Sequence, residues 1–313
     1  MPELGPFDRQ VLFFGGKGGV GKTTFAAAFA VRAARAGHRT LLVSTDPAHS
    51  TSDVLEHPLG PEPRCVSEGL WALEIDPAAE ADAYVAAARA RMAGSIPPRL
   101  AGEVDRQLDI ARLTPGAEEA ALFDRFTRIL DELGSTYDRV LFDTAPLGYT
   151  LRLLGLPESL TAWTESLIGR RRKANALTAM WRRVAGSMPQ GTDAVDPVLE
   201  VLAERRDRFA RTRQLLLDTA RAGFVMVCMA EHLAVAETER AATILRRHGI
   251  PIAAGVSNRL RGGTDEARYN DRLRQAMDPQ AVFMLEEQPF ELRGVEALGR
   301  VVDLLRPDPA PTP

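Results

Sequence analysis

The segment GGKGGVGKTT, at residues 15–24, carries residue types at a spacing that suits phosphate binding. It matches the pattern G-x-x-x-x-G-K-[ST] through Gly16, Gly21, Lys22 and Thr23. Glycines let backbone N–H groups converge on phosphate oxygens with no Cβ in the way. The pattern predicts that Lys22 reaches the β- and γ-phosphates of a nucleotide and that the Thr23 hydroxyl coordinates Mg²⁺. The residues expected to line the phosphates are Gly16, Lys17, Gly18, Gly19, Val20, Gly21, Lys22, Thr23 and Thr24.

Two aspartates follow apolar runs that read as strands. Asp46 comes directly after Thr40–Thr45, and Asp143 comes directly after Arg139–Phe142. Asp46 is a candidate to orient or deprotonate an attacking water, and Asp143 is a candidate carboxylate beside Mg²⁺. Either aspartate alone is more typical of a helix cap or a turn. Their occurrence together with the phosphate loop favours a site that hydrolyses a nucleotide bound with Mg²⁺.

The elements that must position these groups alternate along the chain. Helical patterns at Phe25–Ala36 and Glu118–Leu133 lie between short apolar runs, most of which do not alternate with polar residues. Continuous apolar runs are typical of strands covered on both faces. We therefore expect an α/β fold, a doubly wound and mostly parallel sheet with right-handed crossovers. The runs are Val11–Phe14, Thr40–Thr45, Trp71–Ile75, Arg139–Phe142, Phe224–Met229, Ile252–Ser257 and Ala281–Leu285.

Two longer stretches do not fit a minimal α/β repeat. Residues 77–113 and 156–222 show helical patterns without a convincing strand, and we expect them to form an inserted helical subdomain. Residues 1–306 are then a single P-loop ATPase domain. The proline-rich residues 307–313 are expected to be a disordered tail.

Composition narrows the classes of protein. The 313 residues are 45% hydrophobic and 26% charged, with a net charge of −3, so wholesale disorder and a global attraction to nucleic acid are disfavoured. The two cysteines, Cys65 and Cys228, are too few for a disulfide framework or a cysteine zinc site within one chain. The first ten residues do not read as a signal peptide, and no run of 18 apolar residues occurs. We expect a cytoplasmic protein.

The signature segments resemble those of a known family. The loop GKGGVGKTT is similar to the deviant Walker A class, and together with STDPAHSTSDVL at 44–55 and DTAPLGYTLRLLGLP at 143–157 it resembles the ArsA family of ATPases. The likeness continues through EHLAVAETER at 231–240, SNRL at 257–260 and ELRG at 291–294. That family contains arsenite pump-driving ATPases and the guided-entry ATPases that deliver tail-anchored membrane proteins.

The resemblance implies roles for single residues. Lys17 would cross the interface of an ATP-closed homodimer and contact the partner's nucleotide, a cation delivered in trans. Asp46 would position the hydrolytic water in a first switch loop, Asp143 would begin a second switch, and Asn258 would contact adenine.

The chain also departs from the family pattern. Leu147 and Tyr149 replace the usual threonine and histidine of the second switch, and Glu286 stands where a proline is common. Residues 262–277 lack the C-x-x-C zinc pair of the eukaryotic guided-entry ATPases, so we expect no zinc.

Three cargoes are compatible with such an ATPase. Arsenite or antimonite pumping needs several thiolates, and two cysteines are a poor ligand set. A partition or positioning ATPase shares the loop, but nothing beyond an arginine run at 170–172 supports nucleic-acid binding. A hydrophobic client, such as the transmembrane helix of a membrane protein, or a membrane receptor needs an apolar surface.

An apolar stripe in the second insertion offers such a surface. It recurs near helical spacing opposite a basic face, which also suits a helix packed on its own domain or lying on anionic lipid. We favour a homodimeric ATPase that captures and hands over a hydrophobic client. The residues of this predicted client groove are Trp163, Leu167, Leu177, Met180, Trp181, Val184 and Met188.

Overall fold

A computed structural model describes residues 5–46, 50–92, 98–113, 116–144, 165, 168–169, 173, 197–277 and 282–308. The chain divides into two compact units, the first formed by Met1–Leu153 with Leu216–Pro313 and the second by Leu154–Leu215. The seven residues of the predicted client groove, and Leu147 and Tyr149, lie outside the described residues. The nucleotide-site candidates all fall in the first unit.

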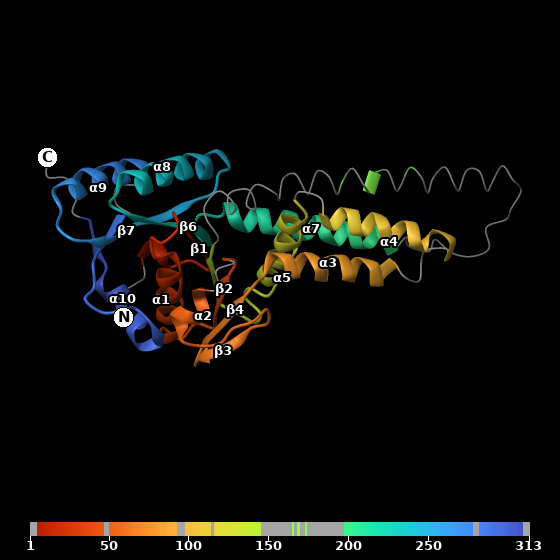
Figure 1. Cartoon of the computed structure of the whole chain (residues 1–313), viewed down its shortest axis with the longest axis horizontal. Helices are drawn as coiled ribbons and strands as arrows, with labels where there is room; N and C mark the ends of the chain where they lie inside the picture. The colour runs from red at the N-terminus through yellow and green to blue at the C-terminus, as the bar shows by residue number, and fades with distance from the viewer. Residues whose placement is uncertain are drawn as a thin grey trace, which may run out of the picture. The chain divides into compact units, whose positions relative to one another are not determined.

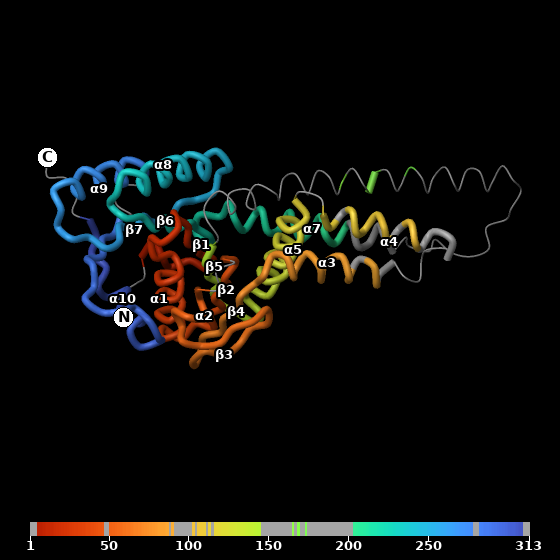
Figure 2. Tube along the Cα trace, viewed as in Figure 1, coloured from red at the N-terminus to blue at the C-terminus, as the bar shows by residue number. Residues whose placement is uncertain are grey.

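The described part of the first unit contains one nine-stranded sheet in the order β3-β4-β2-β5-β1-β6-β7-β8-β9. Neighbouring strands from β4 to β8 run parallel, and the two edge strands β3 and β9 pair antiparallel. Figures 1 and 2 label the strands from β1 to β7, with β5 labelled in Figure 2 only. The strands are β1 (Val11–Gly15), β2 (Thr40–Ser44), β3 (Arg64–Ser67), β4 (Leu70–Glu74), β5 (Arg139–Asp143), β6 (Ala222–Met229), β7 (Ile252–Leu260), β8 (Val282–Glu286) and β9 (Arg306–Pro307).

Helices connect the parallel strands and cover both faces of the sheet. In Figure 1, α8 and α9 lie side by side next to β6 and β7, and α10 lies beside α1. Helices α3, α4 and α5 contact one another. The helices of this unit are η1 (Gly5–Phe7), α1 (Lys22–Arg35), α2 (Ser50–Leu55), α3 (Pro77–Met92), α4 (Pro98–Leu113), α5 (Ala117–Asp131), α8 (His232–Arg247), α9 (Thr264–Ala276) and α10 (Gly294–Leu304).

The central strand β1 is buried on both faces. Its ring of Phe13 stacks on Phe142 of β5 at 5.0 Å and lies 5.6 Å from Phe126 of α5. Its neighbour Phe14 lies 5.6 Å from Phe29 of α1. Because successive residues of a strand point to opposite faces, α1 and α5 cover opposite faces of the sheet. This aromatic packing holds the start of the phosphate loop in place from both sides.

Most of the described residues of the second unit lie in α7 (Pro197–Leu217), a helix rich in charged residues. Glu204 and Arg208 form an ion pair at i, i+4 with a separation of 3.2 Å between Oε1 and Nη2. Among the helices that the structure describes, none is long and apolar enough to cross a membrane.

The seven apolar runs predicted as strands are confirmed, with ends that differ by at most three residues. Two edge strands were not predicted. In β3 the side chains are exposed or half-buried. Its sequence therefore lacks the continuous apolar run by which the other strands were predicted. In β9, Pro307 pairs with Phe283, and an edge position tolerates a proline. The described chain thus continues past the expected boundary at residue 306, as far as Asp308, which pairs with Arg274.

We expect replacement of Phe13 by alanine to lower the free energy of unfolding by about 3–5 kcal/mol, because it opens a cavity between three strands and α5. Urea denaturation followed by circular dichroism measures this change. Phe290→Ala is the matched control, because Phe290 is 51% exposed, and we expect a loss of about 1 kcal/mol or less. Equal losses in the two variants would contradict the central place of β1 in the core.

Candidate active site at the carboxyl edge of the sheet

The phosphate loop lies where the strand order reverses. Its strand, β1, is flanked by β5 on one side and β6 on the other, and such a switch point is where α/β sheets bind ligands. Gly19 and Gly21 adopt φ values of 80° and 101°, which side-chain-bearing residues avoid. A Cβ at Gly16 would overlap with the carbonyl oxygen of Val227 on β6. Each of these glycines is therefore required by the turn or by a close approach.

The two lysines of the loop have different surroundings. Lys22 begins α1 and is only 5% exposed, so its ammonium is held inside the site. Lys17 is half-buried, next to Gly18 and Gly19, which are exposed with open space where a Cβ would stand. With the residues that the structure describes, Lys17 forms no hydrogen bond and no ion pair. One lysine is thus built into its own site, and the other stands at the outer rim of the loop.

Asp143 ends β5 with its carboxylate fully buried. Thr51 of α2 donates a hydrogen bond from Oγ1 to Asp143 Oδ2 at 3.3 Å. The other oxygen, Oδ1, is buried without a hydrogen-bond partner among the described residues. A buried, unsatisfied carboxylate oxygen is costly unless a ligand completes it. Close by, the hydroxyls of Thr23 and Ser50 lie 3.1 Å apart.

Burial raises the pKa of Asp143 to about 6. The nearby Asp46 carboxylate raises this pKa further, whereas Lys22 and the hydroxyls of Thr23 and Thr51 oppose the rise. A buried carboxylate with one oxygen that has no described partner, next to hydroxyl oxygens, is a donor set of the hard oxygen type that Mg²⁺ prefers. The residues present therefore fit a magnesium ion.

Asp46 reaches the same edge from β2. The backbone N–H of Thr45 donates to the carbonyl oxygen of Asp143 at 2.9 Å, which ties the ends of β2 and β5 together. The Asp46 N–H donates to the Ser44 hydroxyl at 3.4 Å, and its side chain is half-buried. The structure thus brings Asp46 and Asp143, candidates from two separate strand ends, together beside the phosphate loop.

A cavity of about 400 Å³ adjoins the loop. Gly21 and Thr24 border it on one side, and Asn258 at the end of β7 and Glu286 at the end of β8 border it on the other. Asn258 is 7% exposed and donates from Nδ2 to the carbonyl oxygen of Val20 at 2.8 Å. Its amide therefore fastens the phosphate loop, and one Nδ2 hydrogen remains for a ligand in the cavity.

Three residues next to this site were not among the predicted ones. Ser50 and Thr51 approach Thr23 and Asp143, and Ser52 is bound by the buried Glu74. The available signal was the run Ser50–Ser52, which follows the Asp46 loop directly. Hydroxyl side chains at the start of a helix commonly bond to nearby backbone groups. Across the described residues, no group of three or more His, Cys, Asp or Glu side chains could hold a metal ion.

Comparisons with known proteins agree with this geometry. Residues 9–306 match the family described as anion-transporting ATPase. ATPase GET3B of Arabidopsis thaliana is 32% identical over 95% of this chain and 79% of its own length. ATPase ASNA1 homolog 1 of Paramecium tetraurelia is 30% identical over 94% and 91%, and the "Putative arsenical pump-driving ATPase" of Chlorobaculum tepidum is 32% identical over 92% and 73%. The chain therefore belongs to the ArsA family of anion-transporting ATPases and is itself an ATPase.

Proposed function

We propose that this ATPase is a homodimeric, magnesium-dependent switch that captures a hydrophobic membrane-protein segment and hands it over. The observation that carries the proposal is a continuous polar path from Asp143 in the nucleotide site to the helices α5 and α3. Such a path gives nucleotide hydrolysis a route to helices outside the nucleotide site. The relatives named GET3 and ASNA1 support the client class, because the resemblance to guided-entry ATPases implies tail-anchored clients.

In the nucleotide site, Lys22 and the glycines of the loop would hold the phosphates, and Thr23 and Asp143 would hold magnesium, Asp143 through water. Bound magnesium supplies charge neutralisation at the β- and γ-phosphates. Asp46 orients the attacking water and accepts its proton. Asn258 uses its remaining donor on adenine in the adjoining cavity.

The dimer follows from Lys17. This lysine stands at the exposed rim of the loop, beside two glycines with open space around them. A partner protomer can approach there closely, and a cation delivered across the interface stabilises the charge that develops on the transferred phosphoryl group. Hydrolysis then depends on dimerisation.

The path begins at α2. Thr51 binds Asp143, and the next residue, Ser52, donates from its N–H and its hydroxyl to Glu74 at 2.8 and 2.9 Å. Glu74 is buried at the end of β4, and its own N–H donates to the carbonyl oxygen of Gly60 at 2.9 Å. Movement of α2 is therefore transmitted to the segment that contains Gly60.

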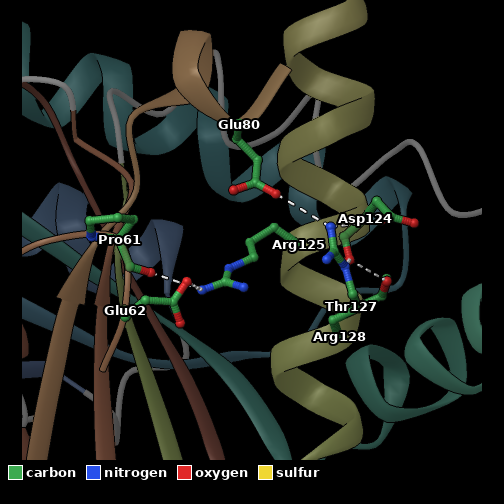
Figure 3. A network of polar contacts seen from close by, with 7 residues as sticks. All are labelled: Pro61, Glu62, Glu80, Asp124, Arg125, Thr127 and Arg128. Atoms are coloured by element: carbon green, nitrogen blue, oxygen red, sulfur yellow. Dashed lines mark hydrogen bonds and ion pairs between the residues drawn. The ribbon is translucent and has the colours of Figure 1, made fainter. Parts of the chain in front are cut away.

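From there the path enters the helices. Arg125 of α5 donates from Nη2 to the carbonyl oxygen of Pro61 at 2.8 Å, as Figure 3 shows. On the same helix, Arg128 forms an ion pair with Glu80 of α3 at 3.3 Å. Thr51, Glu74 and Arg125 are held in helices or strands, whereas Gly60 and Pro61 lie in the segment between α2 and β3. The path therefore runs partly along the backbone of that segment, and coupling through it is part of the proposal.

Exposed apolar side chains on α4 support a hydrophobic client. Leu113 is 76% exposed and Ile110 is 59% exposed. These residues belong to the first predicted insertion, 77–113, and α4 contacts both α3 and α5. The seven residues from Trp163 to Met188 lie outside the described residues, and we propose them as client contacts from the sequence alone.

The arsenite alternative needs several thiolates around one ion, and the cysteines do not supply them within a protomer. Cys65 lies on β3 and Cys228 on β6, five strand positions apart in one sheet, or about 24 Å. Burial also raises the pKa of the Cys228 thiol to about 11, which disfavours the thiolate. Both cysteines are free, which suits the cytoplasm that we propose as the location.

Lys17→Ala should lower ATP turnover by about a thousandfold while ATP binding is retained, because the cation in trans acts on the transition state. Turnover measured against protein concentration should also show a dependence on dimerisation in the unmodified protein. Lys173→Ala is the matched control, because Lys173 is an exposed lysine outside the loop. Turnover that is independent of concentration and unchanged by Lys17→Ala would exclude the trans-acting lysine.

Asp143→Asn should abolish the tightening of ATP binding by Mg²⁺, measured by calorimetry with and without EDTA. The same variant should raise the free energy of unfolding of the ligand-free protein by about 1 kcal/mol or more, because it removes a buried, unsatisfied charge. Asp265→Asn, at an exposed position of α9, should change neither quantity. A ligand-free Asp143→Asn protein that is less stable would show that this carboxylate is satisfied within the protein.

Glu74→Gln and Arg125→Ala should each reduce the stimulation of ATP turnover by a transmembrane-helix peptide, with basal turnover within about twofold. In a double-mutant cycle the two losses should not add, because the residues act along one path. The control is Arg300→Ala, an exposed arginine on α10 outside the path and outside α4. Additive losses would contradict the proposed path.

The same turnover assay tests the class of cargo. Stimulation by arsenite or duplex DNA, with none by the peptide, would replace the client proposal with pumping or positioning.

A further inference from the structure

A second cavity lies at the opposite edge of the sheet from the phosphate loop. Its volume is about 440 Å³, and its lining comes from the residues that precede or begin four parallel strands, β2, β5, β1 and β6. The amino ends of parallel strands are not where such sheets usually bind ligands. The lining residues are Asp8, Arg9, Gln10, His38, Asp138, Arg139, Ala220 and Arg221.

Two of the arginines around this cavity have a carboxylate partner. Arg139 is buried and pairs with Asp8, and Arg39 pairs with Asp138 at 2.6 Å. Hydrogen bonds from Arg39 hold the pKa of Asp138 at about 2, so this carboxylate stays charged and committed to Arg39. Both acidic groups at the cavity are thereby neutralised.

The other two arginines have no carboxylate partner among the described residues. Arg9 donates from Nη1 to the carbonyl oxygen of Ala222 at 3.1 Å, and Arg221 donates from Nε to Gln10 Oε1 at 2.7 Å. Each of these bonds uses a neutral acceptor and one of five guanidinium N–H groups. The cavity is therefore left with an excess of two positive charges and several free donors.

The position of Arg9 restricts the residue type on the neighbouring strand β6. A Cβ at residue 223 would overlap with the Arg9 guanidinium and would lie 2.8 Å from the Cβ of Ala253, so only glycine fits there on β6. Arg9 is half-buried, and burial lowers its pKa. A partly buried cation without a counter-charge is unfavourable, and a bound anion would supply that counter-charge.

His38 lies at the wall of the same cavity, beside Arg139. Its Nε2 lies 3.2 Å from Nη2 of Arg139, and because an arginine N–H can only donate, Nε2 accepts this hydrogen bond. The charged donors left for a ligand are therefore those of Arg9 and Arg221.

We propose that this cavity, at the amino edge of the sheet, binds a phosphate group of a small molecule in solution, held between Arg9 and Arg221. Two uncompensated guanidinium groups match a dianion, and their planar N–H pairs match phosphate oxygens in a bidentate manner. The site is separate from the phosphate loop, because the two lie at opposite ends of the parallel strands.

Calorimetric titration with inorganic phosphate tests this site, at an ionic strength kept constant with sodium chloride. The phosphate loop also binds phosphate, so the titrations use the Lys22→Ala background and, in parallel, the unmodified protein saturated with MgADP. Arg9→Gln and Arg221→Gln should each weaken phosphate binding by about tenfold or more. Arg106→Gln, on the exposed face of α4, should leave it unchanged. Because Arg221 is exposed, its replacement leaves the fold intact even if Arg9→Gln unfolds the protein.

Glycerol 3-phosphate and phosphatidylglycerol vesicles are the comparison probes. Tighter binding of glycerol 3-phosphate than of inorganic phosphate identifies a phosphomonoester as the ligand, and the reverse order identifies free phosphate. Phosphate affinity that is equal in Arg221→Gln and in the parent protein would overturn the proposal. Binding to vesicles alone, with no binding of either soluble probe, would also overturn it. ATP turnover without added phosphate should be unchanged in Arg221→Gln, which separates this site from the proposed switch.

Discussion

The buried carboxylate of Asp143 is the constraint on which the active site depends. It ends a strand at the centre of the sheet, where desolvation raises its pKa to about 6 and leaves one oxygen without a described partner. A protein tolerates such a group where a cation or ligand completes it. The hydroxyls of Thr23 and Thr51 lie beside this carboxylate, and Ser50 contacts Thr23, because three separate segments meet at the carboxyl edge.

The same carboxylate is the first member of the path to the helices. The hydrogen bond from Thr51 ties α2 to Asp143, and the two bonds from Ser52 tie α2 to Glu74. A helix of only six residues, fastened at two points, is well suited to report what occupies the nucleotide site. Arg125 and Arg128 extend this connection into α5 and α3.

The two edges of the sheet are chemically distinct. At the carboxyl edge, glycines and a buried lysine face a buried carboxylate, which is an arrangement for a nucleotide with its metal. At the amino edge, Asp8 and Asp138 are paired with Arg139 and Arg39, so Arg9 and Arg221 leave an excess of positive charge. The parallel direction of the central strands keeps these two environments apart, because each strand contributes its start to one edge and its end to the other.

Much of the fold could be predicted, because apolar runs buried on both faces are a strong local signal. The edge strands β3 and β9 could not, since Arg64–Ser67 has exposed or half-buried side chains and Arg306–Pro307 contains a proline. In the site, the glycine spacing predicted the phosphate loop, and two strand ends pointed to Asp46 and Asp143, whose roles stay predictions. Ser50 and Thr51 were missed because hydroxyl residues near a helix start are common and their partners are distant in sequence.

The sequence by itself determined the phosphate-binding chemistry, the family and the succession of strands and helices, because these depend on residues close together in the chain. The tertiary structure alone decided which distant groups meet. The order of the strands places Asp143 beside Thr51, leaves its Oδ1 without a described partner, and brings Arg9 next to Arg221 across more than two hundred residues. Burial and charge balance are properties of that three-dimensional neighbourhood, and no local pattern encodes them.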